Sequence, residues 1–128
     1  MDERWTRNDE ATRSFIAAWS RMCRDEVDAC FTIVEYSYPI QRSLRINEDE
    51  YVEMKYPEYL KSRTQDLEKV YHDAGQFYFV KTEALVQEKA VWCKRTSPLV
   101  LSELEVQDLD TLTDWQLAEM KFELLRKV

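Results

Sequence analysis

Apolar residues near the start of the chain recur at the three- and four-residue spacing that places side chains on one face of a helix. The members of this stripe are Phe15, Ile16, Trp19, Met22 and Cys23. The pattern predicts a helix over residues 10–25 that packs one face and exposes the other. Residues 29–34, Ala-Cys-Phe-Thr-Ile-Val, form a short run rich in β-branched and aromatic residues, which predicts a buried strand.

Further elements follow from patterns in the middle of the chain. They are a β-hairpin of residues 43–46 and 51–55, a loop with a helical turn over 57–68, a strand over 76–80, a helix over 82–89 and a strand over 99–101. The hairpin turn, residues 47–50, is polar but has no glycine. Helices that alternate with buried strands indicate an α/β fold.

The last predicted helix has the clearest start signal. Thr111 and Asp114 have the spacing of an N-terminal capping box. An apolar stripe at spacings of three and four follows, formed by Leu112, Trp115, Ala118, Phe122 and Leu125. With 128 residues, the chain is long enough for one domain, which we assign to residues 1–128.

Composition and charge narrow the function. A net charge of -7 disfavours nucleic acid and anionic membrane surfaces as partners, and leaves proteins or small molecules. No apolar run has the length of a membrane span, and the first ten residues do not resemble a signal peptide, so we expect a cytoplasmic protein. Three cysteines without a C-x-x-C motif fit reduced thiols.

Two rare residues exclude whole classes of site. The single glycine, Gly75, rules out a glycine-rich loop of the P-loop or dinucleotide-binding kind. The single histidine, His72, rules out H-E-x-x-H zinc sites and multi-histidine metal cages.

Two polar segments are candidates for chemistry. Residues 62–78 combine a guanidinium, amides, carboxylates, an imidazole and a phenol around Gly75, a composition suited to a polyhydroxylated, carboxylated ligand. A solvated loop in which His72 caps a turn explains the same residues. In residues 106–111, Asp108 and Asp110 point to the same side if the backbone is extended, next to a helix N-terminus, and the pair could hold Mg²⁺. Alternatively, both are simple helix-start residues beside Thr111.

Four separated motifs occur in an order that resembles the C-terminal part of the acylneuraminate cytidylyltransferases. The motifs are Y-P-I-Q-R at 38–42, S-R-T-Q-D-L at 62–67, Y-H-D-A-G-Q-F-Y at 71–78 and V-Q-D-L-D-T at 106–111, the last followed by Asp114 and Trp115. The first and third motifs are most similar to the members of the family that use pseudaminic acid. The resemblance covers residues 11–128.

This resemblance implies a reaction and a fold. Enzymes of this family couple CTP to a nine-carbon 2-keto sugar acid, a nonulosonic acid, and release pyrophosphate. Their fold is a three-layer α/β/α sandwich of the nucleotide-diphosphosugar transferase kind, with a β-hairpin insertion, and they are usually dimers.

The resemblance also implies roles for individual residues. Asp108 and Asp110 would be catalytic and hold Mg²⁺, which bridges the phosphates. Six residues would lie in or near the sugar pocket: Gln41, Arg42, Arg63, Gln65, His72 and Gln76. Among them, Arg63 is a candidate for pairing with the carboxylate of the sugar.

The family begins with a basic, glycine-containing nucleotide loop that nothing in this chain matches. We therefore expect a C-terminal portion that lacks the N-terminal CTP-binding half, and that forms a homodimer or associates with that half. The alternative is a non-catalytic domain derived from the family, which binds a sugar acid or dimerises.

Overall fold

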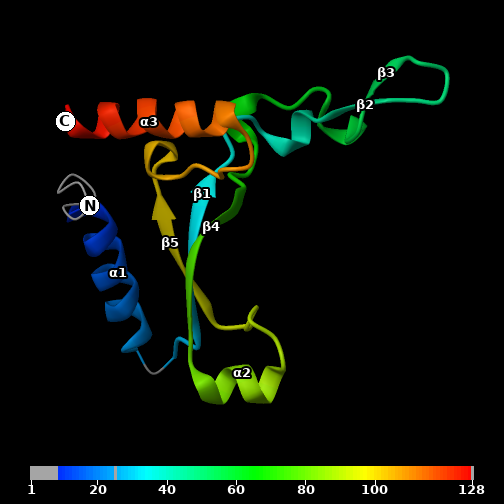
Figure 1. The fold of residues 1–128 in the computed structure, drawn as a ribbon. Helices are drawn as coiled ribbons and strands as arrows, with labels where there is room; N and C mark the ends of the chain where they lie inside the picture. Colours follow the sequence, from blue (N-terminus) through cyan, green and yellow to red (C-terminus); the bar gives the residue numbers. More distant parts are fainter. Residues whose placement is uncertain (1–8, 25, 128) are drawn as a thin grey trace.

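The computed structural model describes residues 9–24 and 26–127, and these residues are arranged around a three-stranded sheet (Figure 1). The strand order is β4-β1-β5. The central strand β1 (Ala29–Glu35) pairs antiparallel with β4 (Tyr71–Val80) and parallel with β5 (Thr96–Leu101). The predicted buried strand at 29–34 is confirmed, and the mixed sheet with three α-helices confirms the α/β class.

Helix α1 (Asp9–Met22) covers one face of the sheet, as the apolar stripe predicted. The Phe15 ring stacks on Phe77 with 4.3 Å between centroids. Ala18 is fully buried in a cluster with Cys30 and two leucines of β5. The larger stripe residues Ile16 and Trp19 lie at the border of this contact and are 61% and 62% exposed.

A second apolar cluster lies on the opposite face of the sheet, near α2 (Thr82–Glu88). Phe31 is its largest member and contacts the rings of Tyr78 and Trp92 edge to face. The predicted helix at 82–89 is confirmed as α2. It ends at Lys89, whose φ of 54° is in the left-handed region.

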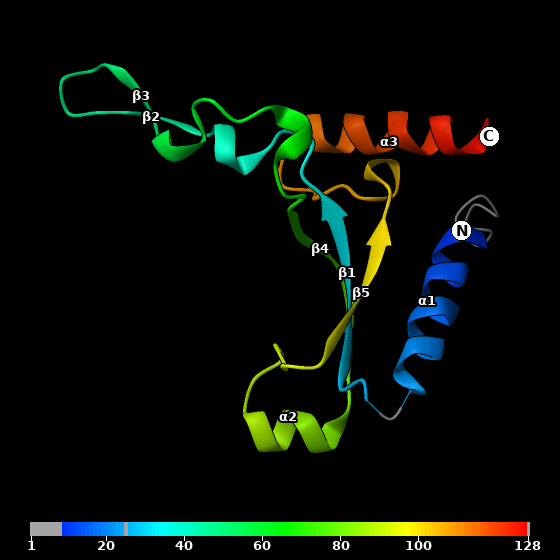
Figure 2. The ribbon, with the colours of Figure 1, turned by 180° about the vertical axis from the view of Figure 1, so that it is seen from behind.

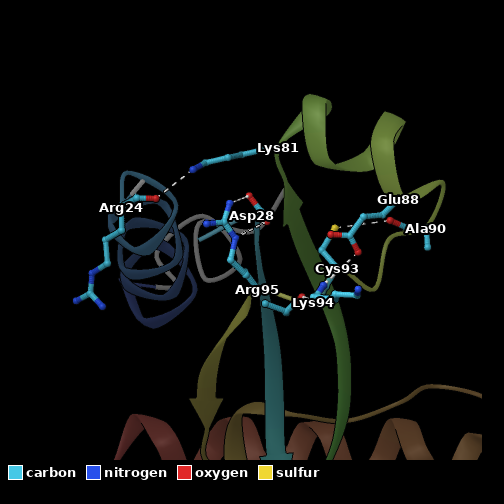
Figure 3. Close-up of polar contacts among 9 residues, drawn as sticks. Arg24, Asp28, Lys81, Glu88, Ala90, Cys93, Lys94 and Arg95 are labelled. Carbon is cyan, nitrogen blue, oxygen red and sulfur yellow. Dashed lines mark hydrogen bonds and ion pairs between the residues drawn. The ribbon is translucent and has the colours of Figure 1, made fainter. Parts of the chain in front are cut away.

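Polar contacts join the segments at this end of the sheet (Figure 3). Arg95 donates two hydrogen bonds to the carboxylate of Asp28, at 2.8 and 2.9 Å. This guanidinium holds the pKa of Asp28 below its usual value. Lys81 donates to the carbonyl oxygen of Arg24 at 3.0 Å, which links the end of β4 to the end of α1.

The predicted β-hairpin is confirmed as β2 (Leu44–Ile46) and β3 (Val52–Met54), and Figure 2 shows it as an arm that extends away from the sheet. Its turn is built without glycine. The side chain of Asn47 accepts from the backbone N–H groups of Asp49 and Tyr51, and Glu50 takes a positive φ of 65°. The turn predicted within 57–68 consists of two short 3₁₀ helices, Pro57–Tyr59 and Thr64–Asp66.

Helix α3 (Leu112–Arg126) crosses one end of the sheet (Figure 1). Its capping box is confirmed: the Thr111 hydroxyl accepts from the N–H of Asp114, and the Asp114 carboxylate accepts from the N–H of Thr111 at 2.8 Å. The pKa of Asp114 is lowered, first by a hydrogen bond that the Thr111 hydroxyl donates to its carboxylate at 2.7 Å and then by the backbone N–H of Thr111. The predicted apolar stripe is only partly inward, since Leu112 and Trp115 are exposed. The half-buried residues of α3 are Asp114, Ala118, Lys121, Phe122 and Leu125.

Strand β4 is longer than the sequence indicated. We predicted it over 76–80, with a polar loop before it, but it begins at Tyr71. The pairing with β1 shifts between Phe31, which lies opposite Tyr78, and Ile33, which lies opposite Asp73. A large bulge of β4 between Asp73 and Tyr78 absorbs this shift, and its polar residues hid the strand pattern.

Much apolar surface remains uncovered. The accessible surface area is 10566 Å², whereas a compact monomer of 15.4 kDa exposes about 7,200 Å². Tyr78, Trp92 and Val100 are exposed on or beside the sheet face opposite α1. No helix in the described part of the chain is long and apolar enough to span a membrane.

Candidate functional site

A polar cleft of about 440 Å³ lies at the end of the sheet nearest α3. It is lined from four directions: the end of β1, the bulged part of β4, the segment around η5 (Glu103–Glu105), and α3. The lining includes three of the predicted site residues, His72, Gln76 and Asp108. The folding of the chain therefore brings two of the four sequence motifs, 71–78 and 106–111, to one cleft.

The bulge of β4 shapes one wall of this cleft. Gly75 has a φ of +67°, a conformation that L side chains rarely adopt. The Asp73 carboxylate holds the bulge by accepting from the N–H of Gly75 at 2.8 Å and from the hydroxyl of Tyr78. The second of these bonds raises the pKa of Tyr78. The only glycine of the chain thus lies where the backbone of the candidate site takes a left-handed conformation, which favours glycine.

His72 lies at the start of the bulge with a defined ring orientation. Its ring centroid is 4.8 Å from that of Tyr36, and its Nδ1 is 3.0 Å from the carbonyl oxygen of Asp73. Because a carbonyl oxygen only accepts, a hydrogen bond at this contact places a proton on Nδ1, and in the neutral imidazole Nε2 is then an acceptor. His72 does not cap a turn of a solvated loop, the alternative that the sequence left open, since it belongs to β4.

Two contacts hold the opposite wall in place. Gln76 donates from Nε2 to the carbonyl oxygen of Glu105, which ties the bulge to η5. Lys121 of α3 donates from Nζ to the carbonyl oxygen of Val106 at 2.7 Å. The strand, the η5 segment and α3 are thereby connected around the cleft.

The two aspartates of the fourth motif precede α3, but their side chains do not cap it. The caps are Thr111 and Asp114, and Asp108 instead accepts from the N–H of its neighbour Leu109 at 3.1 Å. Asp110 donates its backbone N–H to Asp114 and is exposed, and Asp108 alone of the pair lines the cleft.

The described residues limit the ways in which Mg²⁺ could be bound at these two aspartates. No group of three or more histidine, cysteine, aspartate or glutamate side chains that could hold a metal is present within the described residues. An all-protein cage is therefore absent from this part of the chain. Two exposed carboxylates suffice where Mg²⁺ keeps water ligands and takes oxygens from substrate phosphates.

Besides Asp110, four predicted site residues lie outside the lining of the cleft. Gln41 is buried and donates to the carbonyl oxygen of Glu68, and Arg42 donates to that of Ser62. These contacts join the first motif, 38–42, to the segment 62–68. The other two residues, Arg63 and Gln65, are exposed, and Arg63 pairs with Asp66 at 2.8 Å.

The charges of the cleft are unbalanced. Its lining contains four carboxylates, from Glu35, Asp73, Glu103 and Asp108, against one ammonium, from Lys121. Carboxylate and amide groups are suited to hydrogen bonds with the hydroxyls of a sugar and to a divalent cation. A ligand that also carries an anionic group has a single cationic partner in this lining.

Sequence reasoning missed Lys121 and Glu103. Lys121 directly precedes Phe122, at the border of the apolar stripe predicted for α3, where an inward lysine is a weak signal. Glu103, which accepts from the Ser37 hydroxyl at 3.0 Å, comes from a segment with no motif. Only the pairing of the strands brings it to the cleft.

Comparison with known proteins identifies relatives of this chain by sequence. No protein-family model matches the chain. Two proteins from Campylobacter jejuni strains, both named pseudaminic acid cytidylyltransferase, are 36% identical over 107 residues, which cover 84% of this chain and 46% of each relative. A Helicobacter pylori protein named pseudaminic acid cytidylyltransferase and UDP-2,4-diacetamido-2,4,6-trideoxy-beta-L-altropyranose hydrolase is 31% identical over 100 residues, which cover 78% of this chain and 19% of that protein.

The chain is thus related to cytidylyltransferases, the class that its motifs and their order indicated. Within that class, the relatives reported above are named pseudaminic acid cytidylyltransferase, and the resemblance of this chain to the family is confirmed. The chain spans about half the length of the C. jejuni relatives that it matches.

Proposed function

We propose that this chain is the sugar- and metal-binding portion of a nucleotidyltransferase that joins CMP from CTP to a nonulosonic acid and releases pyrophosphate. The observation that carries the proposal is the 36% identity over 84% of the chain to proteins named pseudaminic acid cytidylyltransferase. The acid is then pseudaminic acid or a related sugar acid such as sialic acid, and the reaction takes place in the cytoplasm.

In this proposal the cleft holds the sugar acid. His72 Nε2 accepts a hydrogen bond from a sugar hydroxyl, and Gln76 presents its amide oxygen, because its amide nitrogen is already bonded to Glu105. Gln41 and Arg42 act by holding the 62–68 segment, and Arg63 and Gln65 approach the sugar from that segment.

Asp108 and Asp110 hold Mg²⁺ in this proposal. When bound, the ion neutralises negative charge on the phosphates as the anomeric hydroxyl of the sugar attacks the α-phosphorus. The capping box at Thr111 fixes the start of α3 directly after the two aspartates.

The proposal extends to the architecture. We place the mixed sheet within a three-layer α/β/α sandwich, in which further strands pair with the open edge of β5 and further helices cover the exposed apolar face. The surface in excess of a compact monomer supports this placement. The partner that covers this face is a region equivalent to the part of the relatives that the chain does not match, a second copy of the chain, or both.

Reconstitution tests the proposal. The chain is mixed with the region of the C. jejuni relative that it does not cover, and pyrophosphate release from CTP and pseudaminic acid is measured with and without Mg²⁺. We expect release only from the mixture with Mg²⁺, and none when the chain carries Asp110→Ala. Full release by the folded Asp110→Ala variant contradicts the metal assignment, while Glu119→Ala, an exposed carboxylate on α3, is the matched control.

The same uncovered surface favours a second candidate function, a non-catalytic domain that binds a sugar acid or dimerises. Sedimentation of the chain alone tests self-association. A dimer supports this candidate, and a monomer at high concentration contradicts its dimerisation form.

A further inference from the structure

Lys121 is a positively charged group whose hydrogen-bonding capacity is only partly used. Its ammonium is partly buried and donates one hydrogen bond, to the carbonyl oxygen of Val106. An ammonium has three donors, and among the described residues Lys121 takes part in no ion pair. A partly desolvated charge without an anionic partner is unfavourable unless a ligand supplies one.

The position of Lys121 places this charge in the candidate site. It lines the cleft together with His72, Gln76 and Asp108, and it is the one lysine or arginine in that lining. The hydrogen bond to Val106 fixes its ammonium on the side of the cleft that carries Asp108.

We propose that Lys121 is the anion-binding residue of the cleft and that it contacts the carboxylate or a phosphate of the bound ligand directly. This inference rests on the proposed function for the identity of the ligand, but not for the existence of the anion site. A cleft with four carboxylates repels an anionic ligand, and a fixed ammonium reduces this repulsion at one point. The ligand is thereby oriented with its anionic group toward α3 and its hydroxyls toward the carboxylates.

Calorimetric titration of the full chain tests the proposal with three probes: pseudaminic acid, its neutral methyl ester, and inorganic pyrophosphate. The informative variant is Lys121→Gln, because glutamine can still donate to the Val106 carbonyl but carries no charge. Lys121→Arg keeps the charge, and Lys127→Gln removes an exposed lysine near the end of the same helix as a matched control.

We expect Lys121→Gln to weaken binding of one anionic probe by about tenfold or more, the usual loss when a charge-assisted hydrogen bond is removed. Lys121→Arg and Lys127→Gln should stay close to the unmodified chain. Weaker binding of pseudaminic acid alone identifies the sugar carboxylate as the partner of Lys121. Weaker binding of pyrophosphate alone identifies a phosphate. Binding of the methyl ester should be the same in the unmodified chain and in Lys121→Gln.

Three results overturn the proposal. The first is that the unmodified chain and Lys121→Gln bind each anionic probe with the same affinity. This result refutes the contact between Lys121 and the ligand, whether or not the reconstituted enzyme is active. Equal weakening of acid and methyl ester assigns Lys121 a purely structural role. Failure of the unmodified chain to bind either anion shows that the cleft is no anion site. Failure of the proposed function gives a different result, namely no pyrophosphate release from the reconstituted mixture.

Discussion

Gly75 is the position at which the backbone of the candidate site depends most directly on one residue. Its φ of +67° lies in the left-handed region, and an added Cβ meets no atom within 4 Å. Gly75→Ala therefore tests backbone conformation without a steric clash. The same protein offers a reverse experiment at Lys89, which ends α2 with a φ of 54° and bears a side chain in that conformation.

The magnitude follows from two opposing terms. The left-handed conformation costs a residue with a Cβ about 1–2 kcal/mol, and the lower freedom of alanine in the unfolded chain returns about 0.4–1 kcal/mol. Gly75→Ala should therefore lower the free energy of unfolding by about 1 kcal/mol. Lys89→Gly should raise it by about the same amount, because glycine is the preferred residue at this position of a helix end.

Urea unfolding followed by circular dichroism measures both changes. With a slope of about 1.5 kcal/mol/M, the midpoint should fall by about 0.7 M for Gly75→Ala and rise by a similar amount for Lys89→Gly. Gly75→Asn should lie between Gly75→Ala and the unmodified chain, since asparagine tolerates the left-handed region. Unchanged midpoints for both main variants, or shifts of the same sign, refute the assignment of these backbone conformations.

Three further predictions concern stability. Thr111→Ala should lower the free energy of unfolding of the chain by about 1 kcal/mol in thermal denaturation, because it removes the hydroxyl that caps the N-terminus of α3. An equal loss from Thr113→Ala, inside the helix, would contradict this cause. The hydroxyl of the fully buried Thr32 has no hydrogen-bond partner among the described residues, so the isosteric Thr32→Val should raise the free energy of unfolding by about 1 kcal/mol, and a loss in urea unfolding would show that the hydroxyl has a partner. Arg95 lowers the pKa of Asp28 from 3.8, so the contribution of this pair to stability is present above that pH and is lost as the pH falls through the folded-state value. The urea midpoints of the unmodified chain and Asp28→Asn should therefore differ at pH 7 and converge at acidic pH, and a gap that is independent of pH would refute the ion-pair assignment.

Local sequence signals predicted the elements well where a short stretch decides the structure. Thr111 and Asp114 predicted the start of α3 because a capping box is formed by residues three apart. The hairpin was also predicted, although Asn47 and the positive φ of Glu50 replace the usual glycine in its turn.

The sequence was less informative where distant segments decide the structure. The polar bulge of β4 concealed five residues of strand, since the pairing of Asp73 with Ile33 depends on a partner forty residues away in the chain. The prediction of which residues of α3 face inward was only half correct, for a similar reason. Leu112 and Trp115 fit the helical spacing, but the described residues provide no surface that buries them.

For the candidate site, the sequence identified the motifs at 71–78 and 106–111 as two separate segments, and only the fold shows that they meet at one cleft. His72, Gln76 and Asp108 share the cleft, whereas Gln41 and Arg42 hold a neighbouring segment. Lys121 carries no motif, and only the packing of α3 on the segment at Val106 reveals it.

The central claim, that the cleft at the β4 bulge is the sugar-acid site, is tested most directly by nuclear magnetic resonance of the chain during titration with pseudaminic acid. The account predicts that the largest amide shifts occur at Asp73, Gly75, Gln76 and Asp108, which line the cleft. Hairpin residues 44–54, far along the arm, serve as the internal reference and should not shift (Figure 2). Saturable binding without shifts at the bulge, or no binding at all, would contradict the claim.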